Sequence, residues 1–297
     1  MKIWCPVRSK GHNSIEAQKS YNKLSNLQPS GTLQPVASPL HARQGWHGWD
    51  SYAPFYDWEN ARTVGRRDVP FWVDLARRAA GPVLELGCGT GRVSVPVAKV
   101  ADSFVGVDRS APMLARLQTR LRRARVRSRV AVVRADIRAL PFRRRVRFQL
   151  VMAPYGILQS LLGDADLSAT LESTARVIGR GGMVAIDLVP DLPQWQECER
   201  RVSLRGKATG GRQLTLIESV RQDRRRRLTI FDQEFIERRG RQRRVHRFSL
   251  AFRTLTVPQV TQRLERAGLR VDAVLGGYRE QEWHPEAEVW VILARRR

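Results

Sequence analysis

The amino-acid sequence predicts an α/β fold in which a doubly wound, mainly parallel sheet carries helices on both faces and is interrupted by a small antiparallel β insertion. Three observations lead to this prediction. Short apolar runs alternate with helical patterns from about residue 82, a glycine-rich turn follows the first of these runs, and segments after Pro193 alternate polar with apolar side chains. Alternating strands and helices are typical of a parallel sheet, whereas strands with one polar face are typical of an antiparallel sheet.

The N-terminal part of the chain differs from the rest. Residues 1–45 are rich in Ser, Asn, Gln, Lys and Pro without a sustained period, so we expect a disordered extension. A translation start misassigned upstream of the true one would produce the same pattern. Order is expected to begin in residues 46–81, with an aromatic-dense stretch and then a helix that Asp68 caps and Gly81-Pro82 ends.

Residues 82–195 are predicted to form the core, because apolar runs alternate there with helical patterns. The predicted strands are Val83–Leu86, Ser103–Val107, Val130–Arg134, Val146–Met152 and Gly182–Leu188. The predicted helices are Arg92–Val100, Ala111–Arg123 and Leu167–Ile178, the last closed by Gly179.

Residues 196–255 are predicted to form the β-rich insertion, and residues 256–297 to complete the core sheet. The strands of the insertion are expected at Gln213–Arg221, Leu228–Glu237 and Arg243–Thr254. The last core elements are expected to be a helix at Val257–Ala267 and strands at Leu269–Val274 and Glu288–Ala294.

The net charge of +25 invites a nucleic-acid interpretation, because Arg neutralises phosphates. Only six of the 53 basic residues are Lys, and such uniform Arg enrichment favours a compositional bias over a selected binding face. Three scattered Cys predict neither a disulfide framework nor a zinc site. No apolar run approaches the roughly 20 residues of a membrane-spanning helix. We therefore expect a cytoplasmic protein with no metal and no membrane partner.

The most specific motif is the run Glu85-Leu-Gly-Cys-Gly-Thr-Gly91, directly after an apolar strand. Glycines there let the backbone turn sharply and approach a ligand, and the next helix N-terminus offers N–H donors. A dinucleotide-binding loop needs a small residue at the position of Arg92, counted from Gly87. Arg92 therefore argues against a nicotinamide cofactor.

The spacing Gly-x-Gly-x-Gly, with Glu85 two residues before it, resembles motif I of the class I S-adenosylmethionine-dependent methyltransferases, in their small-molecule methyltransferase-domain branch. Three further segments match in order: Val107-Asp108, Ala135-Asp136-Ile137 and Phe148–Tyr155. The resemblance covers about Tyr52 to Leu188. It implies a Rossmann-like sheet of seven strands with an antiparallel last strand, and S-adenosyl-L-methionine as the cofactor.

The resemblance also implies a set of cofactor-binding residues. Asp108 would accept the ribose hydroxyls, Asp136 and the backbone N–H of Ile137 would bind the adenine, and the lid aromatic Tyr56 would close over the cofactor. The predicted set is Tyr56, Glu85, Gly87, Gly89, Gly91, Asp108, Met113, Asp136, Ile137 and Ala153. Polar strand ends and a core Met113 are the structural alternatives. Arg62 is a further candidate, for the methionine carboxylate.

The sequence indicates the residues that would bind the methyl acceptor less specifically than those that would bind the cofactor. The loop from Ala153 to Gln159 is expected to line the methyl site, with Tyr155 and Gln159 as the candidate residues that orient the acceptor. A purely structural loop is the alternative. His246 and His284 are candidate bases from the C-terminal half.

Three functions fit these observations. The leading hypothesis is methyl transfer to a nitrogen or oxygen of a small molecule, with the insertion as a cover and as a homodimer contact, and with Arg-rich turns that would suit an anionic acceptor. The second is an RNA or DNA methyltransferase. It is disfavoured because Ala153-Pro154-Tyr155 lacks the Asn or Asp and the first Pro of adenine-N6 enzymes. The third is a non-catalytic regulatory protein that binds S-adenosylmethionine.

Overall fold

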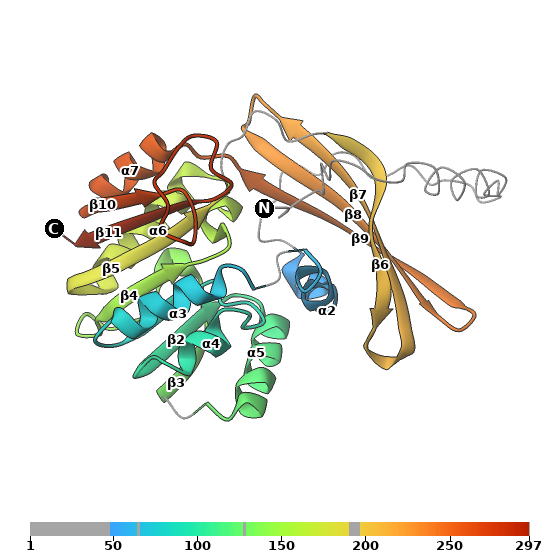
Figure 1. The fold of residues 1–297 in the computed structure, drawn as a ribbon, viewed down its shortest axis with the longest axis horizontal. Helices are drawn as coiled ribbons and strands as arrows, with labels where there is room; N and C mark the ends of the chain where they lie inside the picture. Colours follow the sequence, from blue (N-terminus) through green and yellow to red (C-terminus); the bar gives the residue numbers. More distant parts are fainter. Residues whose placement is uncertain (1–47, 64–65, 127–128, 190–196, 297) are drawn as a thin grey trace.

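The computed structural model describes residues 48–63, 66–126, 129–189 and 197–296. A seven-stranded sheet with helices on both faces forms the larger part, and a four-stranded antiparallel sheet forms the smaller part (Figure 1). The extension predicted at residues 1–45 lies outside the described residues.

The larger sheet has the strand order β10-β11-β5-β4-β1-β2-β3. Its strands are β1 (Val83–Leu86), β2 (Ser103–Asp108), β3 (Arg129–Arg134), β4 (Phe148–Ala153), β5 (Ile178–Leu188), β10 (Leu269–Leu275) and β11 (Trp290–Arg296). The first five pair in parallel, and β11 runs antiparallel to both of its neighbours. The predicted seven-stranded α/β fold with an antiparallel last strand is therefore confirmed.

Helices cover the two faces of this sheet and bury two separate apolar clusters. One cluster includes side chains of α6 (Asp164–Val177) and α7 (Val257–Arg266). The other includes side chains of α3 (Val69–Arg78) and α4 (Ser94–Ala98). The helix α5 (Ala111–Ala124) packs beside β2 and β3. Apolar stripes on helices from both sides explain why the interior strand β1 is buried over its whole length.

Three local predictions differ from the structure. The helix predicted from Arg92 begins only at Ser94, since Gly91 adopts φ 86° and the chain is still turning there. Asp68 occupies the N-cap position of α3, but its carboxylate pairs with Arg92 and makes no capping hydrogen bond. Gly179 does not close α6, because Ile178 already adopts an extended conformation and starts β5.

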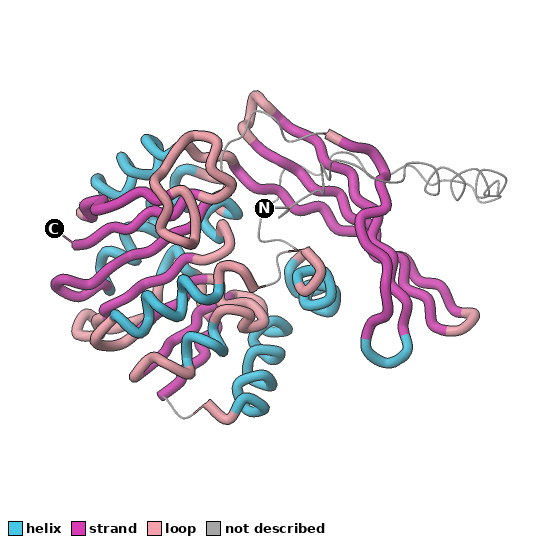
Figure 2. The backbone as a smooth tube through the Cα atoms, viewed as in Figure 1, coloured by secondary structure: helices cyan, strands magenta, loops and turns pink. Residues whose placement is uncertain are grey.

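The smaller sheet is a meander in the order β6-β7-β8-β9 (Figure 2). Its strands are β6 (Cys198–Ala208), β7 (Arg212–Asp223), β8 (Leu228–Arg239) and β9 (Gln242–Arg253). The last three correspond to the predicted strands of the insertion. β6 was not predicted as a strand, since its residues are largely polar and exposed and carry no clear alternation.

The helix α2 (Trp49–Asn60) lies between the two sheets (Figure 1). Its aromatic residues explain this position: Tyr52, Phe55 and Trp58 are buried in a cluster with Leu214, Leu216 and Phe235 of the smaller sheet. The ring of Tyr52 lies 5.9 Å from that of Phe235 and 5.1 Å from that of Phe248. Contacts of this kind dock an amphipathic helix on a sheet face. α2 thereby connects the insertion with the core.

Candidate active site

A cavity of about 420 Å³ opens at the carboxyl ends of β1, β2 and β3, where α2 forms the opposite wall. In open α/β sheets this edge is the usual place for a ligand. Eight of the ten predicted cofactor-binding residues line it. They are Tyr56, Glu85, Gly87, Gly89, Asp108, Met113, Asp136 and Ile137.

The glycine-rich loop turns out of β1 with left-handed backbone conformations. Gly87 has φ 64° and Gly89 has φ 50°, values that glycine adopts without a steric cost. A Cβ at Gly87 would stand 2.5 Å from the side chain of Ile157, so a larger residue would collide with the loop after β4. Gly91 does not line the cavity; a Cβ there would collide with Leu117 of α5. Gly91 therefore packs the loop closely against α5.

Asp108, at the end of β2, connects the glycine-rich loop with the start of α5. Its two carboxylate oxygens accept hydrogen bonds from the backbone N–H groups of Gly89 at 2.8 Å and Ser110 at 2.9 Å. Burial raises the pKa of Asp108, and these hydrogen bonds oppose that rise. The carboxylate is therefore held in place at the cavity wall with unused lone pairs for further donors.

Glu85 is a buried acid in an otherwise apolar strand. Its side chain is 2 % exposed, and its Oε2 atom has no hydrogen-bond partner. Burial raises the pKa of Glu85 to about 8. A buried acceptor without a donor is costly, and a ligand that brings an N–H group to this wall of the cavity would satisfy it. The amino group of S-adenosylmethionine has that chemistry, so the residues present fit this cofactor.

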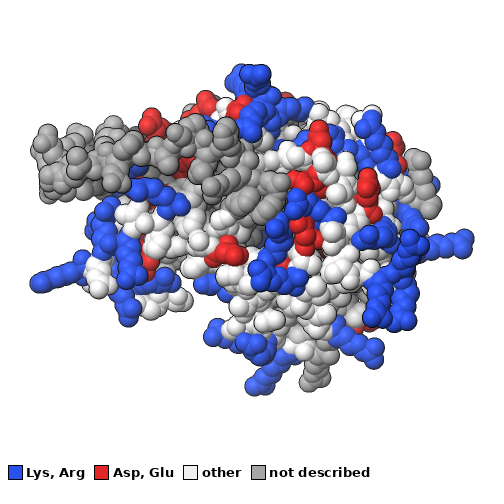
Figure 3. All heavy atoms as spheres, turned by 180° about the vertical axis from the view of Figure 1, so that it is seen from behind, with Lys and Arg blue, Asp and Glu red and all other residues white. Residues whose placement is uncertain are grey.

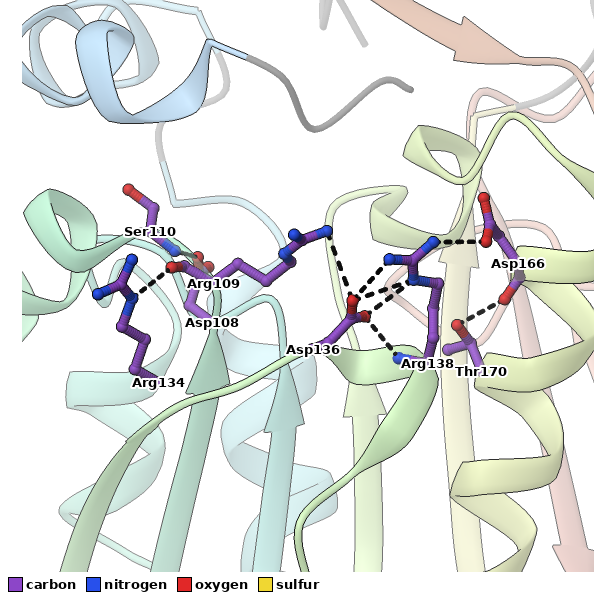
Figure 4. Close-up of polar contacts among 8 residues, drawn as sticks. All are labelled: Asp108, Arg109, Ser110, Arg134, Asp136, Arg138, Asp166 and Thr170. Atoms are coloured by element: carbon purple, nitrogen blue, oxygen red, sulfur yellow. Dashed lines mark hydrogen bonds and ion pairs between the residues drawn. The ribbon is translucent and has the colours of Figure 1, made fainter. Parts of the chain in front are cut away.

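Asp136, after β3, is part of an ion-pair network that the sequence did not predict (Figure 4). Arg138 donates to both carboxylate oxygens of Asp136 and also pairs with Asp166 of α6 at 2.6 Å. The Arg109 guanidinium lies 3.4 Å from Asp136. Burial raises the pKa of Asp136, but the hydrogen bonds and charge of Arg138 outweigh it, so that the net pKa is lowered. Asp136 is thus an ionised carboxylate at neutral pH.

The helix α2 is tied to the glycine-rich loop and to α5 through Asp57. One oxygen of this carboxylate accepts a 2.6 Å hydrogen bond from Thr90 in the glycine-rich loop. Arg116 and Arg120 of α5 also pair with Asp57, at 3.4 Å and 3.1 Å. Tyr56, the preceding residue, lines the cavity, and burial raises its pKa to about 12. Asp57 and Thr90 were not predicted, although both stand inside the segments that the sequence singled out.

Tyr155 lies in the loop after β4 and lines the cavity. It adopts φ 63°, which is rare for a bulky residue and is found mainly where the surroundings impose it. Its ring lies 5.2 Å from the guanidinium of Arg92. Arg92 in turn forms a bidentate pair with Asp68, whose side chain is 2 % exposed. Arg92 therefore connects the glycine-rich loop with α3 and with Tyr155.

Asp187, near the end of β5, binds the loop after β4 through hydrogen bonds. It accepts a 2.7 Å hydrogen bond from the N–H of Gly156 and a 2.6 Å hydrogen bond from the hydroxyl of Tyr278. Asp187 is 2 % exposed, and burial raises its pKa to about 6. The sequence analysis did not identify Asp187 as a site residue, although an acidic residue inside the apolar run of β5 is a signal for one.

We expect Asp187→Ala to loosen the loop after β4, because Gly156 and Tyr278 both lose their acceptor. Hydrogen-exchange mass spectrometry should detect faster exchange of the backbone amides of residues 155–160, by about one order of magnitude. Asp187→Asn keeps an acceptor oxygen and serves as the control, with near-native exchange. Unchanged exchange in the Ala variant would contradict the role assigned to Asp187.

Several predicted residues have other contacts. The amide of Gln159 accepts from Val189 N–H and donates to the carbonyls of Val189 and Arg253, so Gln159 joins β9 to the core and does not line the cavity. We therefore withdraw its role in orienting the acceptor. Ala153 is buried in the core at the end of β4 and does not line the cavity, whereas Pro154 and Tyr155 after it do.

The weaker candidates are placed away from the cavity as well. Arg62 donates to the carbonyls of Trp58 and Lys207 and stacks on the Trp58 ring at 4.6 Å, so it fastens α2 to β6. His246 pairs with Glu237 at 3.1 Å in the smaller sheet, and His284 is exposed. Neither histidine lines the cavity.

The sequence comparisons give a consistent picture. Residues 83–182 match the family model of a methyltransferase domain. A demethylmenaquinone methyltransferase of Lactiplantibacillus plantarum is 34% identical over 165 residues, which cover 52% of this chain. The match spans 66% of the length of that relative.

Solved structures share the fold over most of the chain. An S-adenosylmethionine-dependent methyltransferase from Clostridium acetobutylicum matches with a TM-score of 0.69 and 16% identity, covering 83% of this chain and 99% of that one. A sugar N-methyltransferase from a Streptoalloteichus species matches with a TM-score of 0.65 and 17% identity, covering 91% of this chain and 100% of that one. At these identities the likeness is one of fold.

Proposed function

This chain belongs to the class I S-adenosylmethionine-dependent methyltransferases, and from that premise we propose that it transfers a methyl group to a nitrogen or oxygen atom of a small molecule. The observation that carries the proposal is the cavity between the strand ends and α2, with the unpaired Oε2 of Glu85 and the fixed carboxylate of Asp108 on its wall. A nitrogen acceptor is favoured, since one neighbour of closely similar fold is a sugar N-methyltransferase.

The cofactor supplies the electrophilic methyl group. The protein has to bind the cofactor, orient the acceptor and exclude water. We assign the amino group of the methionine part to Glu85, the ribose hydroxyls to Asp108, and the adenine to Asp136 and the backbone N–H of Ile137. Met113 would pack against the adenine. Gly87 and Gly89 leave room for the cofactor to approach the backbone.

Two tyrosines are the candidates for excluding water and orienting the acceptor. Tyr56 of the lid helix and Tyr155 of the loop after β4 both line the cavity, and burial raises the pKa of each. Both hydroxyls are therefore protonated at neutral pH and can act as hydrogen-bond donors, but they cannot serve as bases without losing that proton. An amine acceptor that binds with a free lone pair would need no further base.

The charge distribution supports a small acceptor over a nucleic acid. On the face drawn in Figure 3, Lys and Arg stand in several separate groups with Asp and Glu between them. Many of the described arginines pair with carboxylates of the same chain, as Arg138 and Arg253 do. A nucleic-acid footprint would gather unpaired basic residues in one stripe. Among the described residues, none of the helices has the length and apolar character that crossing a bilayer requires.

Two finer expectations concern the insertion. An anionic acceptor would be attracted by the exposed turn Arg224–Arg227, and a homodimer would form through the smaller sheet. Both remain predictions. Sedimentation velocity of the purified protein tests the dimer directly.

The decisive experiment uses S-adenosylmethionine with a labelled methyl group. We expect incubation with a small-molecule cell extract to place label on one or a few metabolites, at a nitrogen or oxygen atom that mass spectrometry identifies. Label only on RNA or DNA would favour the nucleic-acid function. Cofactor binding without any labelled product in small-molecule, protein or nucleic-acid fractions would favour a regulatory role.

A further inference from the structure

A buried polar cluster lies between α2 and the smaller sheet. We name it the Glu59 cluster and define it as Glu59 of α2, Glu218 of β7 and Gln233 of β8. The amide nitrogen of Gln233 donates to Glu59 at 2.9 Å and to Glu218 at 2.8 Å. Glu59 is 4 % exposed and Gln233 is 2 % exposed. One amide therefore bridges two carboxyl groups inside an otherwise aromatic interface.

The cluster has more acceptors than donors. Oε2 of Glu59 and Oε1 of Gln233 are buried without a hydrogen-bond partner, and so is Oδ1 of the adjacent Asn60. An unpaired buried polar atom destabilises the folded protein, and two neighbouring carboxyl groups repel each other when both are ionised. Burial and the charge of Glu218 raise the pKa of Glu59 to about 8, although the hydrogen bond from Gln233 opposes that rise. A donor with a positive charge would remove both costs.

The cluster lies outside the cavity but near Tyr155, one of the residues that line it. Glu59 is three residues after Tyr56 on α2, so the two side chains share a helix face. Tyr56 and Tyr155 both line the cavity. Burial raises the pKa of Tyr155, and the nearby Tyr56 and Glu59 raise it further. Glu59 itself does not line the cavity, so a ligand would reach it past these two tyrosines.

We propose that the Glu59 cluster is the subsite that recognises the acceptor, and that the acceptor is an amine that binds in its protonated form, with N–H groups that donate to Glu59 and Gln233. A protonated amine has no free lone pair, so one proton passes to the Glu59 carboxylate before the nitrogen takes the methyl group. This inference rests on the proposed function, which it narrows from nitrogen or oxygen to an amine nitrogen. An ammonium group brings up to three donors and one positive charge, which match the unpaired oxygens and the two carboxyl groups. A neutral alcohol brings one donor and no charge.

A metal ion matches the cluster less well. Two carboxyl groups and an amide offer fewer hard oxygen ligands than Ca²⁺ or Mg²⁺ takes. Within the ranges that the structure describes, no group of three or more His, Cys, Asp or Glu is placed to hold a metal. The neighbouring Glu234 points to the opposite face of β8, where Arg200 and Arg247 pair with it. The basic residues on that face therefore do not neutralise the Glu59 cluster.

The test is calorimetric titration of the full chain, saturated with S-adenosylhomocysteine, with cyclohexylammonium chloride and with cyclohexanol. These probes have the same ring and differ in the ammonium group. We expect the ammonium ion to bind about tenfold more tightly than the alcohol at pH 7.5. Glu59→Gln and Glu218→Gln should each weaken the ammonium ion about tenfold and leave the alcohol unchanged. Glu234→Gln is the matched control on the same strand and should bind both probes like the native chain.

Equal binding of the two probes, or native ammonium binding by both Glu59→Gln and Glu218→Gln, would overturn the amine subsite. A merely structural cluster predicts that Glu59→Gln raises the melting temperature and leaves ammonium binding unchanged, since it removes a buried acid. The titration does not depend on turnover. Failure of the proposed function would appear separately, as absence of labelled product in the transfer experiment while the ammonium ion still binds.

Discussion

Asp108→Ala is expected to raise the Kd for S-adenosylmethionine about 100-fold, since hydrogen bonds to a charged group contribute about 1.5–3 kcal/mol each. The carboxylate has two functions. It holds the glycine-rich loop and the start of α5 through the N–H groups of Gly89 and Ser110, and in the proposed complex it accepts the ribose hydroxyls. The substitution removes the ligand contact and releases the loop. Isothermal titration calorimetry measures the Kd directly.

The control for this prediction is Asp102→Ala. Asp102 is exposed and immediately precedes β2, at the opposite end of the strand from Asp108. Its removal should change the Kd by less than about twofold, because exposed substitutions away from a site usually have small effects. A folded Asp108→Ala variant that binds the cofactor as tightly as the native chain would exclude the assigned role.

Arg92→Ala is expected to lower the free energy of unfolding by about 3–5 kcal/mol, because it leaves the buried carboxylate of Asp68 without a partner. The side chains of Arg92 and Asp68 are 12% and 2% exposed, and the pair is bidentate. Arg92 also stacks against Tyr155. Urea denaturation followed by circular dichroism measures the loss.

Two comparisons sharpen this prediction. Arg77→Ala breaks the exposed pair with Asp74 in α3 and should cost no more than about 0.5 kcal/mol. The double variant Asp68→Leu with Arg92→Met should be more stable than Arg92→Ala, because no buried charge is left unpaired. If Arg92→Ala loses no more stability than Arg77→Ala, the pair is not a structural anchor.

Much of the fold followed from local patterns. The apolar runs placed the core strands, and their alternation with helices predicted the parallel sheet that the structure contains. The missed strand β6 lacks such a pattern, since it is an edge strand with mostly exposed, polar side chains. The boundaries of α4 and α6 were misplaced for a related reason. The conformations of Gly91 and Ile178, not the apolar period, decide where these helices begin and end.

The candidate site was predicted in part. Glu85, Asp108 and Asp136 stand at the ends of neighbouring parallel strands, and strand ends on one edge of a sheet meet at one cavity. The acceptor side was predicted less well. Gln159 was chosen for its place in the loop sequence, but its amide is used by backbone groups of Val189 and Arg253. The position of a residue within a loop sequence does not reveal whether its side chain lines the cavity.

By itself, the sequence determined the α/β fold, the class of cofactor and the strand ends that line the cavity, because these depend on patterns within a few residues of each other. Only the tertiary structure decided the roles of Arg92, Asp187 and Glu59. Their partners Asp68, Tyr278 and Gln233 are 24, 91 and 174 residues away along the chain. Hydrogen bonds and ion pairs act over a few ångströms in space, so such pairs exist only once the sheets and α2 have packed together.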